Sequence, residues 1–157
     1  MDDLREGKDR KLSFKGKTLD LEPPWPRFTM AEALHSLAGV DGERTATTEG
    51  LLAEIAARGL EPPQEALGGP DGRPFFGVLL AFLFESLCEE KLDGPVFIID
   101  HPVEISPLAK QKPGDPRFTE RFELYLGGME VANAFSELND PDVQAERFRQ
   151  QLAAREA

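Results

Sequence analysis

Hydrophobic residues along the chain follow helix-like patterns in three places. Residues 74–91 carry an apolar side chain at nearly every position as far as Phe84, which is typical of a buried helix. Residues 29–39 open with a Thr-Met-Ala-Glu capping box and end at a glycine, and residues 47–59 open with threonines and also end at a glycine. We therefore expect three helices over these ranges.

Shorter apolar runs predict strands at residues 12–14, 19–21, 96–99, 119–126 and 129–135. The run at 96–99 is apolar throughout, which indicates an interior strand that is covered on both faces of its sheet. Because the strands are few and short, we expect part of the sheet to lie outside these 157 residues.

A last helix is predicted after Asp140-Pro141, with the aspartate as its cap and the proline at its first position. Arg147, Arg149 and Arg155 alternate there with glutamates. We expect these arginines to lie on a solvated face.

Proline-rich segments separate the predicted elements. Residues 23–26 contain three prolines, which forbid regular structure, and we expect Trp25 among them to be a packed anchor rather than a stacking platform for bases. Residues 61–74 are rich in proline and glycine and are expected to form a surface connection. His35 has no partner at metal-ligand spacing, so a structural or exposed position is expected.

Length, charge and cysteine content exclude several classes of protein. A length of 157 residues suits one domain, and a net charge of −11 argues against broad electrostatic binding of nucleic acid. Cys88 is the only cysteine, which excludes a disulfide framework and fits a reducing cytoplasm. The first 11 residues have no apolar core, and no run is long enough to span a bilayer. We expect a cytoplasmic protein with no membrane partner.

The candidate chemistry lies in residues 119–140, which have the pattern of a β-hairpin. Gly127-Gly128 can take the positive φ angles of a two-residue turn. Three glutamates are spaced seven residues apart over this hairpin, namely Glu123, Glu130 and Glu137.

In such a hairpin Leu126 faces Met129 and Tyr125 faces Glu130. Glu123 shares a face with Tyr125, so Glu123 and Glu130 become diagonal neighbours on one side of the sheet. A divalent cation that carries phosphate oxygens could lie between the two carboxylates. Solvated glutamates on an exposed face are the alternative, and the pairing geometry alone leaves both open.

Asp100 and His101 follow the strand at 96–99 and suggest an acid–base pair. Adjacent residues of a strand point to opposite faces, so we favour hydrogen-bonding roles in the loop. The loop at 103–117 carries Lys110, Lys112 and Arg117, and long loops of this kind often border ligands.

Three segments resemble lysyl-tRNA synthetases of the second class: FKGKTLDLEPPWPRFTMAEAL, PVFIIDHPVEISPLAK and TERFELYLGGMEVANAFSELNDPDVQAERF. The likeness is weakest between residues 40 and 94. Aspartyl and asparaginyl enzymes share the fold and the hairpin but lack ISPLAK and FSELNDP. A lysyl-transfer enzyme that modifies an elongation factor resembles the chain at ERFE and E-x-A-N, and departs from it at SPLAK and SELND.

The resemblance implies an α+β fold, namely a partial class II aminoacyl-tRNA synthetase catalytic domain with an antiparallel sheet flanked by helices. It divides the chain into a frayed start at 1–11, a helical insert-like region at 40–94, active-site strands at 95–140 and a C-terminal helix at 141–157.

The resemblance also assigns roles. Glu123 and Glu130 match the pair that holds Mg²⁺ on ATP, and Glu137 matches the residue that reads the lysine side chain. Asn133 and Phe135 match residues that line the amino-acid pocket. Strict alternation from Glu130 would turn Asn133, Phe135 and Glu137 to the opposite face, so a shared pocket requires a twist or a bulge in this strand.

The implied function is part of a lysine–tRNA ligase that activates lysine with ATP and Mg²⁺ and transfers it to tRNA(Lys). The family's two phosphate-binding arginines are expected outside these residues. The missing synthetase portion or a homodimer partner is the expected protein partner. No catalytic residue is therefore assigned here, and the chain alone is expected to be inactive. A non-catalytic binding or regulatory module and the elongation-factor lysyl-transfer enzyme are the alternatives.

Overall fold

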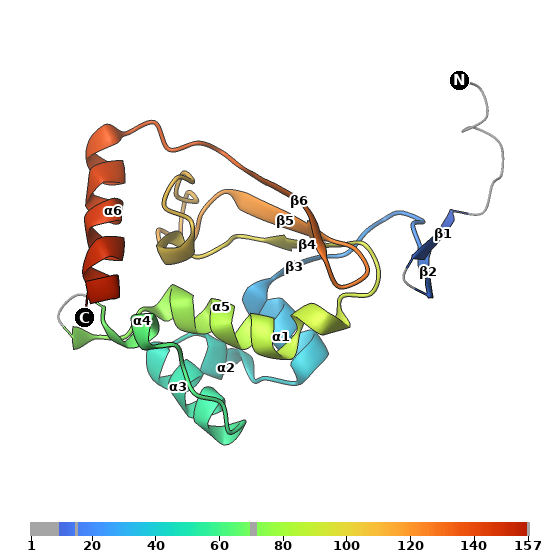
Figure 1. The fold of residues 1–157 in the computed structure, drawn as a ribbon, viewed down its shortest axis with the longest axis horizontal. Helices are drawn as coiled ribbons and strands as arrows, with labels where there is room; N and C mark the ends of the chain where they lie inside the picture. Colours follow the sequence, from blue (N-terminus) through green and yellow to red (C-terminus); the bar gives the residue numbers. More distant parts are fainter. Residues whose placement is uncertain (1–9, 15, 70–71, 157) are drawn as a thin grey trace.

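The computed structural model describes residues 10–14, 16–69 and 72–156, with side chains as far as Leu152. Figure 1 shows a sheet that lies above a layer of helices, with a small separate hairpin at one end and an upright helix at the other. The strands are β1 (Lys11–Phe14), β2 (Lys17–Asp20), β3 (Arg27–Thr29), β4 (Val96–Ile99), β5 (Arg121–Tyr125) and β6 (Glu130–Phe135). The helices are α1 (Met30–Ala38), α2 (Gly42–Thr45), α3 (Thr48–Ala57), α4 (Gln64–Leu67), α5 (Phe76–Leu87) and α6 (Pro141–Glu156), with 3₁₀ turns η2 (Glu89–Lys91) and η3 (Val103–Ile105).

Local caps set the helix boundaries as the sequence predicts. The Thr29 hydroxyl accepts from the Glu32 backbone N–H at 3.2 Å, and the Glu32 carboxylate accepts from the Thr29 N–H at 2.8 Å. Gly39 ends α1 with a left-handed φ of 66°. Thr47 caps α3, and the Asp140 carboxylate accepts from the first backbone N–H groups of α6. All four predicted helices are confirmed.

The core lies between α5 and the sheet. Helix α5 buries one face, including Leu79, Leu80, Leu83 and Phe84. Residues of α1, α3, β4 and β5 complete this core, and the ring of Tyr125 packs edge-on against Phe84 with centroids 6.3 Å apart. The prediction that residues 74–91 form the central buried helix is confirmed.

The main sheet has four strands in the order β3-β4-β5-β6. Strand β4 pairs antiparallel with β5, and β5 pairs antiparallel with β6. Strand β3, which was not predicted, pairs parallel with β4, so the sheet is mixed rather than antiparallel throughout. The proline-containing segment at residues 23–26 leads directly into β3.

Interior strand β4 is fully covered on one face and only partly on the other, contrary to the prediction of full cover on both. Val96 and Ile98 are buried against the helices, whereas Phe97 and Ile99 are half-buried on the other face. Aromatic rings give partial cover there, because Phe97 contacts Trp25 at 6.0 Å and Phe122 at 5.4 Å between ring centroids. Trp25 is thus a packed anchor, as expected.

Other differences are local. The connection at 61–74 includes the short helix α4, and α2 was not predicted. Strand β6 is exposed at every position along its length, as an edge strand is when no neighbour covers it. The expected fraying at 1–11 lies outside the described residues as far as residue 9, and Lys11 begins β1. Among the described residues no helix is long and apolar enough to cross a membrane.

Candidate functional site

The β5–β6 hairpin closes as its sequence predicts. Gly127 and Gly128 have φ angles of 62° and 73°, which side chains other than glycine rarely adopt. The backbones of Leu126 and Met129 exchange hydrogen bonds of 2.8 and 3.2 Å. Tyr125 pairs with Glu130, so the predicted facing of these residues is confirmed.

A bulge then changes the register of β6. Tyr125 pairs with Glu130 and Leu124 pairs with Ala132, which leaves Val131 without an opposite residue. Beyond it, Asn133 lies opposite Glu123.

Paired residues point to the same face of a sheet, so the bulge turns Asn133 to the side that carries Glu123 and Glu130. Phe135 lies opposite Arg121, two residues before Glu123, and joins the same face. The sequence left open whether this strand twists or bulges. The structure has a bulge, one residue after Glu130.

Glu123 is buried, with 8% of its surface exposed. Its Oε1 accepts from Nη2 of Arg121 at 2.6 Å, and its Oε2 accepts from the Tyr125 hydroxyl at 2.9 Å. Nε2 of His101 lies 3.9 Å from the same Oε2. The positive group that sits beside Glu123 in this structure is therefore Arg121.

Negative charge accumulates around the hairpin. Burial raises the pKa of Tyr125, and the adjacent Glu123 carboxylate raises it further. Burial also raises the pKa of Glu89 in η2, and the charges of Glu123 and Glu130 add to that rise. A bound cation would lower the energy of these carboxylates.

The oxygen donors of the hairpin fit a hard cation that brings other ligands with it. Among the described residues, no group of three or more His, Cys, Asp or Glu side chains could hold a metal ion. Glu123 and Glu130 offer carboxylate oxygens from one face, and Glu130 is exposed. Mg²⁺ usually takes one or two carboxylates together with water and substrate phosphates, which matches this donor set.

Glu137 lies beyond β6 and is exposed. Its backbone forms an antiparallel bridge with Ala109, flanked by a 2.7 Å bond from Lys110 N–H to the Ser136 carbonyl and a 2.8 Å bond from Leu138 N–H to the Leu108 carbonyl. The loop with the ISPLAK sequence thus holds the backbone of Glu137.

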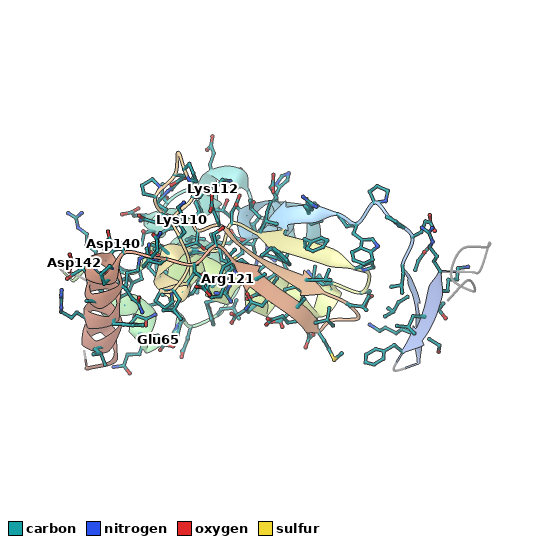
Figure 2. The ribbon with its side chains drawn as sticks, turned by 90° about the horizontal axis from the view of Figure 1, so that it is seen from above. Glu65, Lys110, Lys112, Arg121, Asp140 and Asp142 are labelled. Atoms are coloured by element: carbon teal, nitrogen blue, oxygen red, sulfur yellow. The ribbon has the colours of Figure 1, made fainter. Side chains whose placement is uncertain are left out.

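Arg121 is the first site residue that sequence reasoning missed. In addition to Glu123, its guanidinium binds the Ile105 carbonyl at 3.0 Å, the Ser106 hydroxyl at 2.9 Å and Oδ1 of Asn133 at 3.2 Å. Figure 2 shows Arg121 at the start of β5, near the loop that carries Lys110 and Lys112. Its position two residues before Glu123 was a usable signal, because such residues share a face of a strand.

Arg147 is the second residue near the site whose position sequence reasoning missed. Its predicted solvated position is wrong, because its side chain is 8% exposed and donates to the carbonyls of Pro107 at 3.2 Å and Ala109 at 2.7 Å. Burial lowers the pKa of Arg147. Arg149 is exposed as expected and pairs with Glu146, whereas the side chain of Arg155 lies outside the described residues.

Asp100 and His101 take separate positions, as alternation predicts. Nζ of Lys112 lies 2.5 Å from a carboxylate oxygen of Asp100, which has a positive φ of 57°. His101 is buried, its Nε2 lies 3.2 Å from the Ile98 carbonyl, and burial lowers its pKa. His35, which is exposed, has Nδ1 3.0 Å from the Val40 carbonyl.

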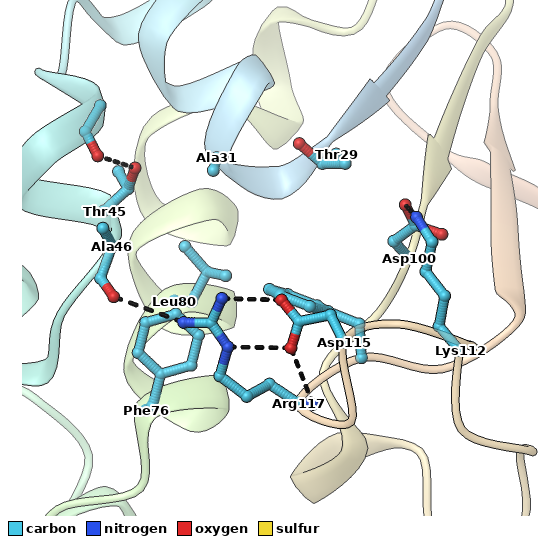
Figure 3. Close-up of a pocket in the computed structure, with 12 residues that line it drawn as sticks. Thr29, Ala31, Thr45, Ala46, Phe76, Leu80, Asp100, Lys112, Asp115 and Arg117 are labelled. Carbon is cyan, nitrogen blue, oxygen red and sulfur yellow. Dashed lines mark hydrogen bonds and ion pairs between the residues drawn. The ribbon is translucent and has the colours of Figure 1, made fainter.

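A separate cavity of about 340 Å³ lies between the helices and the loop at 112–118 (Figure 3). Its main cation, Arg117, already forms a fork with Asp115 and lies over the rings of Phe76 and Phe118 at 5.3 and 5.4 Å. The Asp100–Lys112 pair lines its other side. Both cations are neutralised within the cavity wall, so the wall has no free charge with which to select a ligand.

The chain thus has a mixed sheet over a helical layer, with acidic and amide side chains gathered on one face of the β5–β6 hairpin. The family described as tRNA synthetases class II (D, K and N) matches residues 2–157. The chain belongs to this family.

Curated proteins that are similar to this chain include several lysine–tRNA ligases. That of Clostridium perfringens is 46% identical over 146 residues, which are 93% of this chain and 28% of the relative. That of Dehalococcoides mccartyi is 48% identical over 144 residues, which are 92% of this chain and 27% of the relative. The chain therefore spans about 28% of the length of the curated relatives it matches.

Proposed function

We propose that this chain is part of a lysine–tRNA ligase and supplies the face that binds lysine and the Mg²⁺ of ATP. The observation that carries the proposal is the bulge at Val131, which brings Asn133 to the face of Glu123 and Glu130. A regular strand would turn the amide away from the carboxylates. The family and its lysine-specific relatives support the same assignment.

Glu123 and Glu130 hold the metal in this proposal. The charges of Glu123 and Glu130 support a cation here, because they add to the burial that raises the pKa values of Glu89 and Tyr125. When bound, Mg²⁺ would neutralise phosphate charge and orient the α-phosphate for attack by a carboxylate. The bonds from Arg121 and Tyr125 fix the Glu123 carboxylate so that it need not reorganise.

The amino-acid half consists of Glu137, Asn133 and Phe135. Glu137 pairs with the side-chain ammonium of lysine, which would otherwise lose its hydration without a partner. Phe135 is 40% exposed and offers an apolar surface to the methylene groups. Asn133 supplies hydrogen bonds to the polar end of the amino acid.

Transfer to tRNA(Lys) belongs to the complete cytoplasmic enzyme in this proposal. The resemblance places the phosphate-binding arginines of the family in other synthetase sequence. We expect the 157 residues assayed alone to show no lysine-dependent exchange of pyrophosphate into ATP, since charge on the phosphates would lack those partners.

Calorimetric titration of lysine into the chain with Mg-ATP tests the proposed function. We expect binding by the unmodified chain, and Glu137→Gln should weaken it at least tenfold because the ammonium loses its anionic partner. Glu65→Gln is the matched control, since Glu65 is an exposed glutamate on α4 and should leave binding unchanged. Absence of heat from a folded sample, or equal effects of the two substitutions, would contradict the proposal.

A further inference from the structure

We propose that Arg121 is the positioning residue that joins the metal-binding half of the site to its amino-acid-binding half. The inference rests on the proposed function, because it concerns the same residues. It goes further in assigning a specific task to a residue that contacts neither ATP nor lysine in that proposal.

The guanidinium of Arg121 makes four hydrogen bonds. Nη2 donates to Glu123, Nε donates to Asn133, and Nη1 donates to the Ile105 carbonyl and the Ser106 hydroxyl. The side chain is only 16% exposed, so water competes weakly for these bonds. A rigid fork of donors suits this set of acceptors, which lie in different directions.

The contact with Asn133 determines how its amide is turned. A guanidinium has donors only, so the amide must present Oδ1 to Arg121. The Nδ2 group of Asn133 is then left to donate. Asn133 would therefore bind an acceptor such as the carboxylate of an amino acid, and not its ammonium groups.

The contact with the loop extends this link to Glu137. Arg121 holds the loop at Ile105 and Ser106, and the same loop bridges to Glu137 through Ala109. Arg147 holds the loop from the side of α6, and within the described part of the chain its hydrogen bonds go to the loop carbonyls rather than to Glu123 or Asn133. Both arginines therefore bind the loop, but Arg121 also binds Glu123 and Asn133, whereas the described contacts of Arg147 do not reach these residues.

This difference provides a matched pair of variants. Arg121→Lys keeps the charge but replaces the planar fork, whose donors are spread over three nitrogens, with a single nitrogen that cannot span all four acceptors. Arg147→Lys makes the same chemical change at the other anchor of the loop. Both variants are first checked for a native circular dichroism spectrum.

The first measurement needs no ligand. The side-chain amide resonances of Asn133 are followed by ¹⁵N NMR, and their exchange with water is timed. Arg121→Lys should shift these signals and accelerate the exchange, whereas Arg147→Lys should leave them near their original positions. Unchanged Asn133 signals in folded Arg121→Lys would overturn the proposal.

The second measurement tests the coupling between the two halves. The Kd of MgCl₂ is measured by titration without lysine and with saturating lysine, in the absence of ATP. If Arg121 links the halves, the ratio of the two Kd values departs from one in the unmodified chain and returns toward one in Arg121→Lys. A ratio that Arg121→Lys leaves unchanged, or that Arg147→Lys abolishes equally, would contradict the link.

Failure of the proposed function is recognised separately. If the unmodified chain binds neither lysine nor Mg-ATP in the calorimetric titration, the proposed function fails, while the Asn133 resonances still decide whether Arg121 holds that amide. If Arg121→Lys does not fold, Ser106→Ala replaces it, since this change removes one acceptor and leaves the guanidinium in place. A smaller shift of the Asn133 signals supports the link, and no shift opposes it.

Discussion

Charged residues inside this chain are stabilised by specific partners rather than by general solvation. Glu54 on α3 is 6% exposed, and its two oxygens accept from Nη1 of Arg44 at 2.7 Å and Nε of Arg58 at 2.9 Å. Burial alone would raise the pKa of Glu54, but the hydrogen bonds from these arginines outweigh burial and lower it. Paired in this way, a buried carboxylate contributes to stability in a manner that depends on pH.

Glu54→Gln should reduce the free energy of unfolding at pH 7 by about 1 to 2 kcal/mol, because charged hydrogen bonds are lost while both arginines are partly solvated. A carboxyl with a lower pKa in the folded chain stabilises it above the unfolded pKa and loses this effect as pH falls. The difference between the variant and the unmodified chain should therefore shrink below about pH 4.3. Urea unfolding from pH 3 to 7 measures it. Glu61→Gln, at an exposed position, is the control, and a constant difference across this range would refute the expectation.

At the scale of elements, one unpaired residue determines what the hairpin presents. Val131 is 48% exposed and contributes nothing to the core, yet it shifts the rest of β6 by one position. The shift carries Asn133 and Phe135 to the face of Glu123. Side-chain direction in a strand has a period of two, so a shift of the register by one residue turns every side chain beyond it to the other face.

Insertion of an alanine after Val131 should turn Asn133 and Phe135 away from Glu123, because one more residue reverses the face of every side chain beyond it. Lysine binding by calorimetry should fall at least tenfold. Deletion of Val131 is the control, since Asn133 stays opposite Glu123 when the unpaired residue is removed, so the deletion should retain affinity. Circular dichroism should show that both variants fold, because Val131 lies outside the core. Retained affinity after the insertion would mean that the direction of these side chains does not build the pocket.

At the scale of the molecule, a single core holds the helices to the sheet. Side chains from α1, α3, α5, β4 and β5 form one cluster of buried residues. The β1–β2 hairpin lies apart from it in Figure 1, although Lys17 pairs with Asp93 and the Leu19 side chain lies near Gly127. One shared core predicts that these elements unfold together.

We expect a cooperative thermal melt of the chain. Leu83→Ala should lower the free energy of unfolding by about 2 to 5 kcal/mol, because truncation of a core leucine leaves a cavity. Leu83 is fully buried, whereas Leu67 is 45% exposed and Leu67→Ala should change stability by no more than about 0.5 kcal/mol. Circular dichroism with heat and urea measures both. A broad melt without a transition, or equal effects of the two variants, would contradict a single cooperative core.

The features that the sequence alone determined are those with local causes. Thr29 and Glu32 cap a helix through neighbouring groups, and Gly127-Gly128 allow a turn through their own φ angles. The apolar run of α5 likewise predicts burial from its own composition. The facing of Tyr125 and Glu130 follows directly from the turn.

Tertiary structure decided the features that depend on distant residues. The parallel pairing of β3 with β4 joins residues 70 positions apart, and no local pattern encodes it. Arg147 has the charge of a surface residue, but its acceptors are carbonyls of a loop some 40 residues earlier. The spacing of Glu123 and Glu130 was visible in the sequence, whereas the bulge and the four bonds of Arg121 required the folded chain. The packing of separate elements sets the register of paired strands and decides which side chains come within hydrogen-bond distance of each other. The candidate site depends on both, through the register of β6 and the bonds of Arg121.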